Sequence, residues 1–534
     1  MIERIIIKGY RLFKDLDMHP NKQMNIVVGD NEAGKSTLLE ALSIALTGRV
    51  NGKWAQEELN PYWFNREQVL TYFTALAASN PAKPPEILIE LYLDKEDDSL
   101  QTMRGIHNSQ MDSSAPGIQF TVKPSPEYAV EFSEYLASTD RPGILPVEYY
   151  EIEWKDFADQ PLKRRPKGLG VSIIDSRTIR SSAGVDYHTR EMLKDFVEPK
   201  ERAAISVAHR RARHSITTHT LGPVNERIAD MGSILHDRAI GLQMDQSASA
   251  SWETSIVPQV ADIPFAMAGQ GQQAAIKVAL AINRSADSTA YALIEEPENH
   301  LSHTSLTKLV ARIENLAGSR QVFLTTHSSY VLNRLGLDTL LLLHRGHQAR
   351  FDSLPADTVS YFKKLSGYDT LRLVLAQSVV LVEGPSDEMV FARAFADLQG
   401  GKQPIDLGID VVSMKGVSLK RGLQLCAALD RKAAALRDND NKPADHWQEP
   451  LSKWLEPDKR ELFIGDPAAG ATLEPQIIAA NDDQTIRKLL DFDSKKTTEQ
   501  WMSDHKTEWS LRVAEAGASI NYPPYILDAI EFIA

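Results

Sequence analysis

Apolar and polar positions alternate at the start of the chain with the two-residue period of a β-strand. The alternation runs from Ile2 to Lys8, and a second apolar run follows at Met24–Val28. This run leads into a glycine-containing loop and then into a segment of helical periodicity, Ser36–Leu46. The pattern therefore predicts the order strand, loop, helix.

The pattern changes several times before the middle of the chain. Strands are predicted at Ile87–Asp94, Val147–Trp154 and Gly170–Asp175, with a surface loop after the first of them. A long charged stretch from Arg190 to Arg238 has helical periodicity, and we interpret it as a helical insertion. Strand and helix signals return between Phe265 and Leu343.

A second α/β unit is predicted from about Leu371 onward. Consecutive alanines weaken one of its strands, because alanine is depleted in strands. The predicted strands are Val379–Val382, Ile409–Met414, Lys432–Arg437 and Glu461–Ile464.

Composition narrows the class of protein. The 534 residues, 43% hydrophobic and 25% charged, predict two or three domains. The single cysteine, Cys426, excludes an internal disulfide, and no apolar stretch approaches the roughly 20 residues that span a bilayer. The start of the chain does not resemble a signal peptide, so a cytoplasmic protein with no membrane partner is expected. The net charge of −13 does not exclude nucleic acid, because a local basic patch or bound metals still engage phosphate.

A nucleotide-binding loop is predicted between the second strand and the first helix. The segment fits G-x-x-x-x-G-K-[ST] in the strand-to-helix context that this motif requires. Backbone N–H groups of such a loop approach phosphates, Lys35 neutralises phosphate charge and Ser36 holds Mg²⁺. A chance glycine turn is the alternative. The candidate ATP-binding residues of the loop are Gly29, Asn31, Gly34, Lys35, Ser36 and Thr37.

Two carboxylates end an apolar run farther along the chain. The run Tyr291–Ile294 leads into Glu295 and Glu296, which resembles a Walker B element. Glu295 would reach Mg²⁺, and Glu296 would orient or deprotonate the attacking water. Aspartate usually occupies the first position, so the longer Glu295 leaves the rate of ATP hydrolysis open.

Two further features complete a resemblance to ABC-type ATPases of the RecF and SMC branch. Gly269, Gln270 and Gly271 precede a predicted helix, Ala274–Ile282, and resemble a degenerate ABC signature. The predicted strand before His327 ends where these ATPases place a histidine that senses the γ-phosphate. A glycine turn or a histidine taken alone is more often structural. The resemblance implies ATP bound between two copies of the chain, and hence a homodimer or higher homo-oligomer.

Carboxylates also follow the strands of the C-terminal unit. Glu383 and Asp387 lie after one strand, and Asp438 and Asp440 after another. Phosphodiester hydrolysis at a two-metal site needs several hard oxygen ligands. A solvated loop and a surface Asp-Asn-Asp turn are the alternatives. The order of these acids resembles a Toprim domain, in which they would bind Mg²⁺ or Mn²⁺ and take part in catalysis.

The last segments extend this resemblance to the OLD (overcoming lysogenisation defect) nucleases. Glu474 is similar to the additional metal-binding and catalytic glutamate of that family, and Lys506 to its lysine, which would stabilise charge on the pentavalent phosphate. The order ATPase then Toprim is specific to the family. The resemblance implies an α/β fold, with an ABC/RecF-like ATPase head, a helical insertion and a C-terminal Toprim domain. The implied domains are the ATPase at 1–185 and 261–365, a dimerising helical insertion at 186–260 and the Toprim nuclease at 370–534.

The function implied by the resemblance is ATP hydrolysis coupled to metal-dependent cleavage of DNA, in defence against phage. A helicase-like protein, or a reverse transcriptase with its non-coding RNA, is the implied partner. One alternative is a RecF-type ATPase that binds DNA without cutting it, and another is a sensor subunit that uses ATP to hold an oligomer. Two interpretations of the basic cluster His209–His214 stay open: it contacts DNA phosphates across a dimer, or it is a solvated helix face that pairs with acids such as Asp195 and Glu198.

Overall fold

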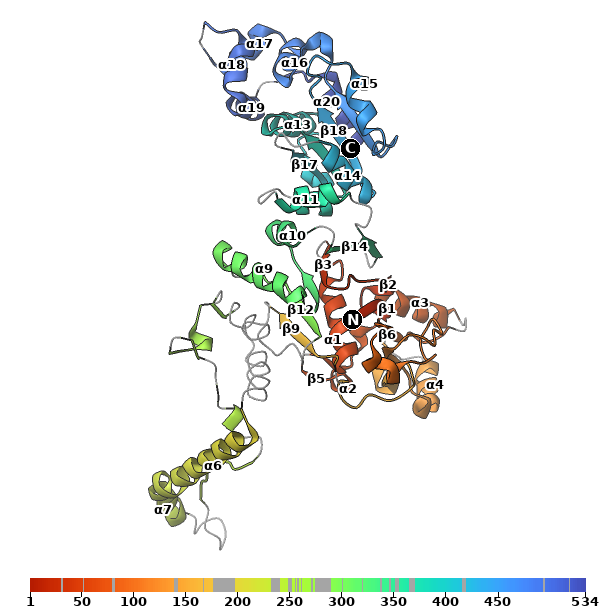
Figure 1. The fold of residues 1–534 in the computed structure, drawn as a ribbon, viewed down its shortest axis with the longest axis vertical. Helices are drawn as coiled ribbons and strands as arrows, with labels where there is room; N and C mark the ends of the chain where they lie inside the picture. The colour runs from red at the N-terminus through yellow and green to blue at the C-terminus, as the bar shows by residue number, and fades with distance from the viewer. Residues whose placement is uncertain are drawn as a thin grey trace. The chain divides into compact units, whose positions relative to one another are not determined.

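The chain divides by its internal contacts into two units, which are coloured along the sequence in Figure 1. The first comprises Met1–Met24 and Ser36–Thr325, and the second Asn25–Lys35 and Thr326–Ala534. The computed structural model describes residues 1–534 apart from 30–31, 51, 79–81, 139–142, 167, 176–196, 232–240, 248–251, 255, 257–258, 261, 270–271, 274–289, 300, 319, 337–338, 345–346, 351–354, 365–369, 415–418, 493–494 and 518.

An antiparallel sheet in the order β2-β1-β6-β7-β8 opens the first unit. The strand predicted at the N-terminus is confirmed, and the three consecutive residues Ile5, Ile6 and Ile7 of β1 are all buried. Sequence analysis missed β2, whose outward positions carry charges. The predicted strand at Val147 starts later, because residues 147–149 form a 3₁₀ turn. The strands are β1 (Ile2–Tyr10), β2 (Phe13–Met18), β6 (Ile87–Leu93), β7 (Gly117–Pro124) and β8 (Tyr150–Asp156).

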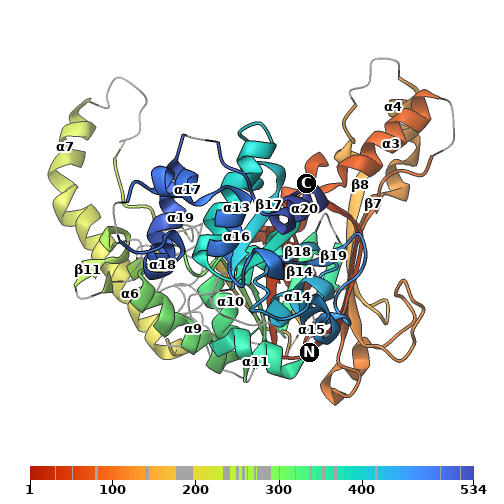
Figure 2. The same ribbon diagram turned by 90° about the horizontal axis from the view of Figure 1, so that it is seen from above.

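Short elements join these strands. Phe132 of α4 meets Tyr150 of β8 edge to face, with ring centroids 5.9 Å apart. Figure 2 shows α3 and α4 at the same end of the sheet. The elements are β4 (Arg49–Val50), β5 (Lys53–Trp54), α2 (Ala55–Glu58), α3 (Arg66–Ala77) and α4 (Ala129–Ala137).

The first unit also contains parallel strands in the order β13-β12-β9. All five residues of β12 and of β13 are buried, as expected for parallel strands that are covered on both faces. The register pairs Glu295 with Thr325 and with Asp175, so the carboxyl ends of the strands meet at one edge. The elements are α1 (Lys35–Thr47), β9 (Val171–Asp175), β12 (Tyr291–Glu295), α9 (His303–Ala317) and β13 (Gln321–Thr325).

Within the predicted helical insertion the structure describes two helices, α6 and α7. The π-helical segment Ile216–Thr220 joins its two helices, and none of the described residues of the first helix is buried. Arg202 forms an ion pair with Glu253, and the Trp252 indole donates to the Ser206 hydroxyl at 2.9 Å. The elements are α6 (Pro199–Ser215), α7 (Gly222–Met231), β10 (Gln259–Val260) and β11 (Ile263–Pro264). The helix predicted at Ala274–Ile282 lies outside the described residues.

The second unit starts with strands in the order β15-β14-β3. β14 runs parallel to β3, with Leu341 beside Val27, and antiparallel to β15. The elements are β3 (Met24–Val28), α10 (Ser329–Leu335), β14 (Leu340–His344), β15 (His347–Arg350), α11 (Ala356–Lys364) and α12 (Thr370–Leu375).

The rest of the second unit is a parallel sheet in the order β17-β16-β18-β19. Val380 of β16 packs in the same core as α13 and α20, whereas Leu381 faces Gly422 of α14 on the other side. Ala433, Ala434 and Ala435 are fully buried, because helices on both faces leave room for small side chains only. Figure 1 shows α13 and α20 beside the strands. The elements are β16 (Ser378–Val382), α13 (Pro385–Leu398), β17 (Ile409–Ser413), α14 (Leu419–Ala428), β18 (Lys432–Arg437), α15 (Ala444–Gln448), β19 (Arg460–Ile464), α16 (Leu473–Ala480), α17 (Asp483–Leu490), α18 (Thr498–Asp504), α19 (Lys506–Glu515) and α20 (Pro524–Ile533).

Within the described part of the chain, no helix is long and apolar enough to cross a membrane. The predicted domain boundaries stay a prediction.

Candidate functional site

The glycine loop predicted to bind a nucleotide joins β3 to α1. A side chain at Gly29 would place its Cβ 2.4 Å from the Leu343 carbonyl oxygen, and Gly34 has a φ of +102°, so both positions require glycine. The Lys35 ammonium is buried and donates to the Gly29 carbonyl at 2.8 Å. Thr37 is buried in the first turn of α1, and Asn31 lies outside the described residues. The loop thus holds its lysine against its own backbone.

Ser36 and Glu295 come together although they are far apart in the sequence. The Ser36 hydroxyl donates a hydrogen bond to the Glu295 carboxylate, which is 8% exposed at the end of β12. A hydroxyl and a carboxylate are hard oxygen donors, the type that Mg²⁺ prefers. This pair therefore fits the magnesium of a bound nucleotide.

Glu296 lies at the bend after β12. Its φ of +44° turns the chain out of the strand, and its N–H donates to the Thr325 carbonyl at 3.0 Å. The Asn299 amide donates to the Glu296 carboxylate at 2.9 Å. These bonds fix the second carboxylate beside the strand end, where a residue that orients water is needed.

The remaining ATPase candidates are only partly described. His327 follows β13 and has an exposed side chain. The Gly269 carbonyl accepts from the Gln273 N–H at 3.0 Å, so the glycine precedes a turn of helix. Gln270 and Gly271 lie outside the described residues.

The acids of the second unit stand at the carboxyl ends of neighbouring parallel strands. Glu383 follows β16 and Asp438 follows β18, and these strands pair in register. The helix α13 begins at Pro385, directly after the strand end, because proline suits the first position of a helix. Asp387 therefore lies in the first turn of α13, where its carboxylate accepts from the Gly384 N–H at 3.1 Å.

Burial and mutual repulsion raise the pKa values of these acids. Burial, reinforced by the other four acids, raises the pKa of Asp438 to about 8. Burial raises the pKa of Glu383 to about 7 against the opposing charge of Arg437, and that of Asp387 to about 6. Each shift means that a negative charge is disfavoured until a cation is nearby. We name Glu383, Asp387, Asp438, Asp440 and Glu474 the acidic cluster.

Two candidates from the last segments reach the acidic cluster. Glu474 is 8% exposed in the first turn of α16 and accepts from the Thr472 hydroxyl at 2.8 Å. Lys506 is the first residue of α19, its carbonyl accepts from Ser386 at 2.7 Å, and its charge lowers the pKa of Asp387. The structure thus gathers every acid predicted in this unit, together with the predicted lysine.

Asn439, between two of the acids, holds the loop in shape. Its side-chain amide is fully buried and donates to the carbonyls of Gly465 at 3.1 Å and Gly470 at 2.6 Å. Asp440 adopts a φ of +49°, and its N–H donates to the Ala471 carbonyl at 3.1 Å. Asn439 therefore ties the strand end that carries two acids to the loop that leads to Glu474.

Replacing Asn439 by alanine is expected to lower the stability of the second unit. The change leaves the buried Gly465 carbonyl without its Asn439 donor and removes one of the two side-chain donors to the Gly470 carbonyl, at a cost of about 1–3 kcal/mol. Thermal unfolding followed by circular dichroism measures the loss. Gln484→Ala removes an exposed amide from α17 and serves as the control. Equal midpoints for the two variants would show that Asn439 does not hold the loop.

Sequence analysis missed two neighbours of the acidic cluster. Arg437 forms ion pairs of 3.6 Å with Glu383 and with Asp440. Tyr525 of α20 is buried, and burial together with four of the acids raises its pKa well above the usual range. The position of Arg437 directly before Asp438 was a usable signal, whereas nothing in the sequence links Tyr525 to the acids.

The acidic cluster fits a divalent metal by donor chemistry. Carboxylate oxygens are the ligands that Mg²⁺ and Mn²⁺ prefer, and the raised pKa values reflect charge that a cation would neutralise. Among the described residues, no three side chains of His, Cys, Asp or Glu are already arranged as a ligand set.

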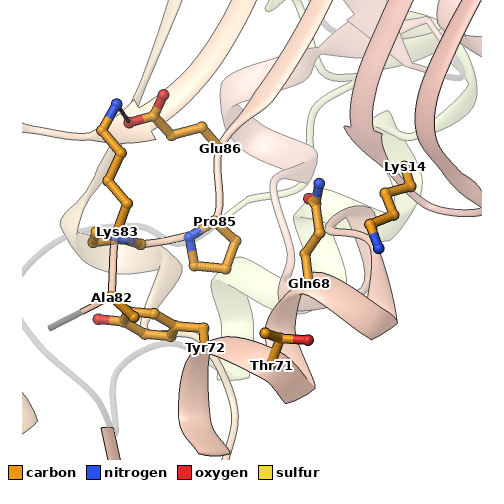
Figure 3. Close-up of a pocket in the computed structure, with 9 residues that line it drawn as sticks. Lys14, Gln68, Thr71, Tyr72, Ala82, Lys83, Pro85 and Glu86 are labelled. Carbon is orange, nitrogen blue, oxygen red and sulfur yellow. Dashed lines mark ion pairs between the residues drawn. The ribbon is translucent and has the colours of Figure 1, made fainter. Parts of the chain in front are cut away.

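A pocket of about 400 Å³ lies beside α3 in the first unit, and we assign it no ligand. Lys83 at its rim pairs with Glu86, and Lys14 pairs with Glu67, so both lysines are already neutralised. Figure 3 shows the lining residues Lys14, Gln68, Thr71, Tyr72, Ala82, Lys83, Pro85 and Glu86.

Family models match three parts of the chain. Residues 4–124 match "AAA domain" and residues 127–333 match "AAA domain, putative AbiEii toxin, Type IV TA system". Residues 374–440 match "Overcoming lysogenization defect protein-like, TOPRIM domain". These matches cover the glycine loop, the paired carboxylates after β12 and four acids of the acidic cluster.

Individual relatives match shorter or more distant parts. The DNA replication and repair protein RecF of Xanthomonas axonopodis pv. citri (strain 306) is 40% identical over 48 residues, which are 9% of this chain and 13% of that protein. The SMC head domain from Thermotoga maritima is 13% identical with a TM-score of 0.29, over 65% of this chain and 97% of that one. The C-terminal region of the Burkholderia pseudomallei OLD protein is 19% identical with a TM-score of 0.24, over 29% of this chain and 96% of that one.

The fold class expected from the sequence is confirmed. AAA family models precede a Toprim family model along the chain, and both regions mix helices with parallel strands. The chain thus matches models of AAA ATPase domains followed by a model of an Overcoming lysogenization defect protein-like Toprim domain, the order of an ATPase–Toprim fusion.

Proposed function

We propose that the protein is an ATP-binding, metal-dependent DNA endonuclease of the OLD type that acts in defence against phage. The observation that carries the proposal is the acidic cluster, in which four carboxylates, those of Glu383, Asp387, Asp440 and Glu474, lie close enough to Asp438 to raise its pKa. A protein that only binds DNA gains nothing from concentrating negative charge in this way, because phosphate is also negative.

The acidic cluster would hold Mg²⁺ or Mn²⁺. A bound divalent metal supplies Lewis-acid activation of the phosphodiester and lowers the pKa of water. Lys506 stabilises the charge that develops on the phosphate, since its ammonium already influences Asp387. Asn439 keeps the strand end and the loop before Glu474 at a fixed spacing.

The ATPase head would bind ATP with Lys35, Ser36 and Thr37. Glu295 and Ser36 would hold the magnesium of the nucleotide, and Glu296 would orient the water for hydrolysis. Gly269, Gln270 and Gly271 contact the nucleotide of a second copy, and His327 senses the γ-phosphate. A nucleotide contacted by two copies of the chain implies a homodimer or higher homo-oligomer. We place this oligomer in the cytoplasm. Its further partners would be a helicase-like protein or a reverse transcriptase and its RNA.

Cleavage of supercoiled and linear DNA tests the proposal. Purified protein is incubated with Mg²⁺ or Mn²⁺, with and without ATP, beside an EDTA control. We expect metal-dependent strand breaks, and Lys35→Ala then shows whether ATP promotes or restrains them. Retarded DNA mobility without breaks in any metal would favour the binding-only ATPase instead.

A further inference from the structure

Arg437 stands at the edge of the acidic cluster with hydrogen-bonding capacity to spare. It ends β18, directly before Asp438, and its side chain is 20% exposed. Its contacts with Glu383 and Asp440 are 3.6 Å long, beyond hydrogen-bonding distance. Its Nε is buried without a hydrogen-bond partner among the described residues. Such a buried donor is costly unless something else accepts from it.

An aromatic ring fixes the plane of this guanidinium. The Arg437 guanidinium carbon lies 3.5 Å from the centroid of the Trp447 ring. The Trp447 indole in turn donates to the Asn439 carbonyl at 3.0 Å, so the ring is held by the same strand end. Stacking occupies the face of a guanidinium and leaves its N–H edges free. Those edges are directed toward Glu383 and Asp440, that is, toward the acidic cluster.

A fixed, planar cation with free N–H edges suits one kind of ligand. Two N–H groups of a guanidinium match two oxygens of a phosphate in a bidentate contact. The acids themselves do not take up these donors at hydrogen-bonding distance. We infer that Arg437, stacked on Trp447, binds non-bridging oxygens of the scissile phosphodiester and positions it at the acidic cluster. This inference rests on the proposed nuclease function.

The test measures DNA binding and metal binding separately, on the full chain. A labelled duplex is titrated in Ca²⁺, which supports binding with little cleavage, and Mn²⁺ binding is followed by calorimetry. Arg437→Gln is expected to weaken DNA binding roughly tenfold or more. It is also expected to reduce the slope of log K against log salt by about 0.9, the value for one lost phosphate contact. Mn²⁺ affinity should be unchanged or higher, because a competing cation has been removed.

Two further variants define the role of the side chain. Arg437→Lys keeps the charge but loses the planar fork, so an intermediate DNA affinity is expected. Arg487→Gln is the matched control, because Arg487 also stacks on an aromatic ring, that of Phe492, and pairs with Asp483, which is not a member of the acidic cluster. If Arg437→Gln does not fold, Arg437→Lys still tests the planar fork.

The outcomes separate this inference from the proposed function. If the wild type binds Mn²⁺ and DNA and Arg437→Gln binds DNA equally well, Arg437 is only a counter-ion of the acids and the inference is wrong. Loss of Mn²⁺ binding in this variant would also overturn it. A wild type that binds neither Mn²⁺ nor DNA would overturn the proposed function together with the inference.

Discussion

In EDTA at pH 8, replacing Asp438 by asparagine is expected to raise the thermal midpoint of the second unit. Burial and the other acids raise the pKa of Asp438 to about 8, so the folded state resists its ionisation. Asparagine has nearly the same shape and carries no charge. The gain is on the order of a few kcal/mol, and each kcal/mol shifts the midpoint of a domain of this size by about 2–4 °C.

The stability gained by Asp438→Asn is expected to depend on pH. Below about pH 4 the carboxyl group of Asp438 is protonated in both states and costs no stability. Between about pH 4 and pH 8 the unfolded chain releases this proton while the folded chain retains it, so stability falls as pH rises. The advantage of Asp438→Asn should therefore be full at pH 8 and absent at pH 4.

Metal and a matched variant provide the controls. Mn²⁺ should raise the midpoint of the wild type more than that of Asp438→Asn, because only the wild type has the full set of carboxylates to neutralise. Asp458→Asn makes the same chemical change at an exposed position with a φ of +65°, which asparagine also tolerates, and should leave the midpoint unchanged. Destabilisation by Asp438→Asn in EDTA would contradict the electrostatic account.

Lys35→Ala is expected to lower the affinity for ATP about a hundredfold or more. The Lys35 ammonium is buried in the glycine loop, and truncating one partner of a buried charge contact costs several kcal/mol. Calorimetric titration with ATP and Mg²⁺ measures the loss. Lys53→Ala removes an exposed lysine that pairs with Glu58 and is the control. Equal affinity in wild type and Lys35→Ala would mean that the loop does not bind the nucleotide.

The elements with strong local signals could be predicted from the sequence. The strand, loop and helix around Lys35 follow from a long apolar run and a spaced motif. The acids after β16 and β18 were also predicted, because they follow apolar runs in an order that resembles a Toprim domain. The strand β18 is rich in alanine, a residue with low β-strand propensity, so its sequence alone predicts a strand only weakly. Burial on both faces of the sheet explains why it is nevertheless a strand.

The parts that were missed depend on tertiary contacts. The proposed role of Arg437 depends on its stacking on Trp447, which lies on the separate helix α15. The sequence does not show that the two side chains stack. Nothing in the sequence links Tyr525 of α20 to the acids, and only the fold brings its phenol near four of them. In both cases the tertiary structure brings the interacting side chains together.

The rate of DNA cleavage in Mn²⁺ by wild type, Asp438→Asn and Asp458→Asn tests the central claim most directly. Loss of one carboxylate should remove several kcal/mol of transition-state stabilisation, so Asp438→Asn should cut about a thousandfold more slowly or not at all. Asp458→Asn should cut at the wild-type rate. Equal rates for wild type and Asp438→Asn would show that the acidic cluster is not the nuclease centre.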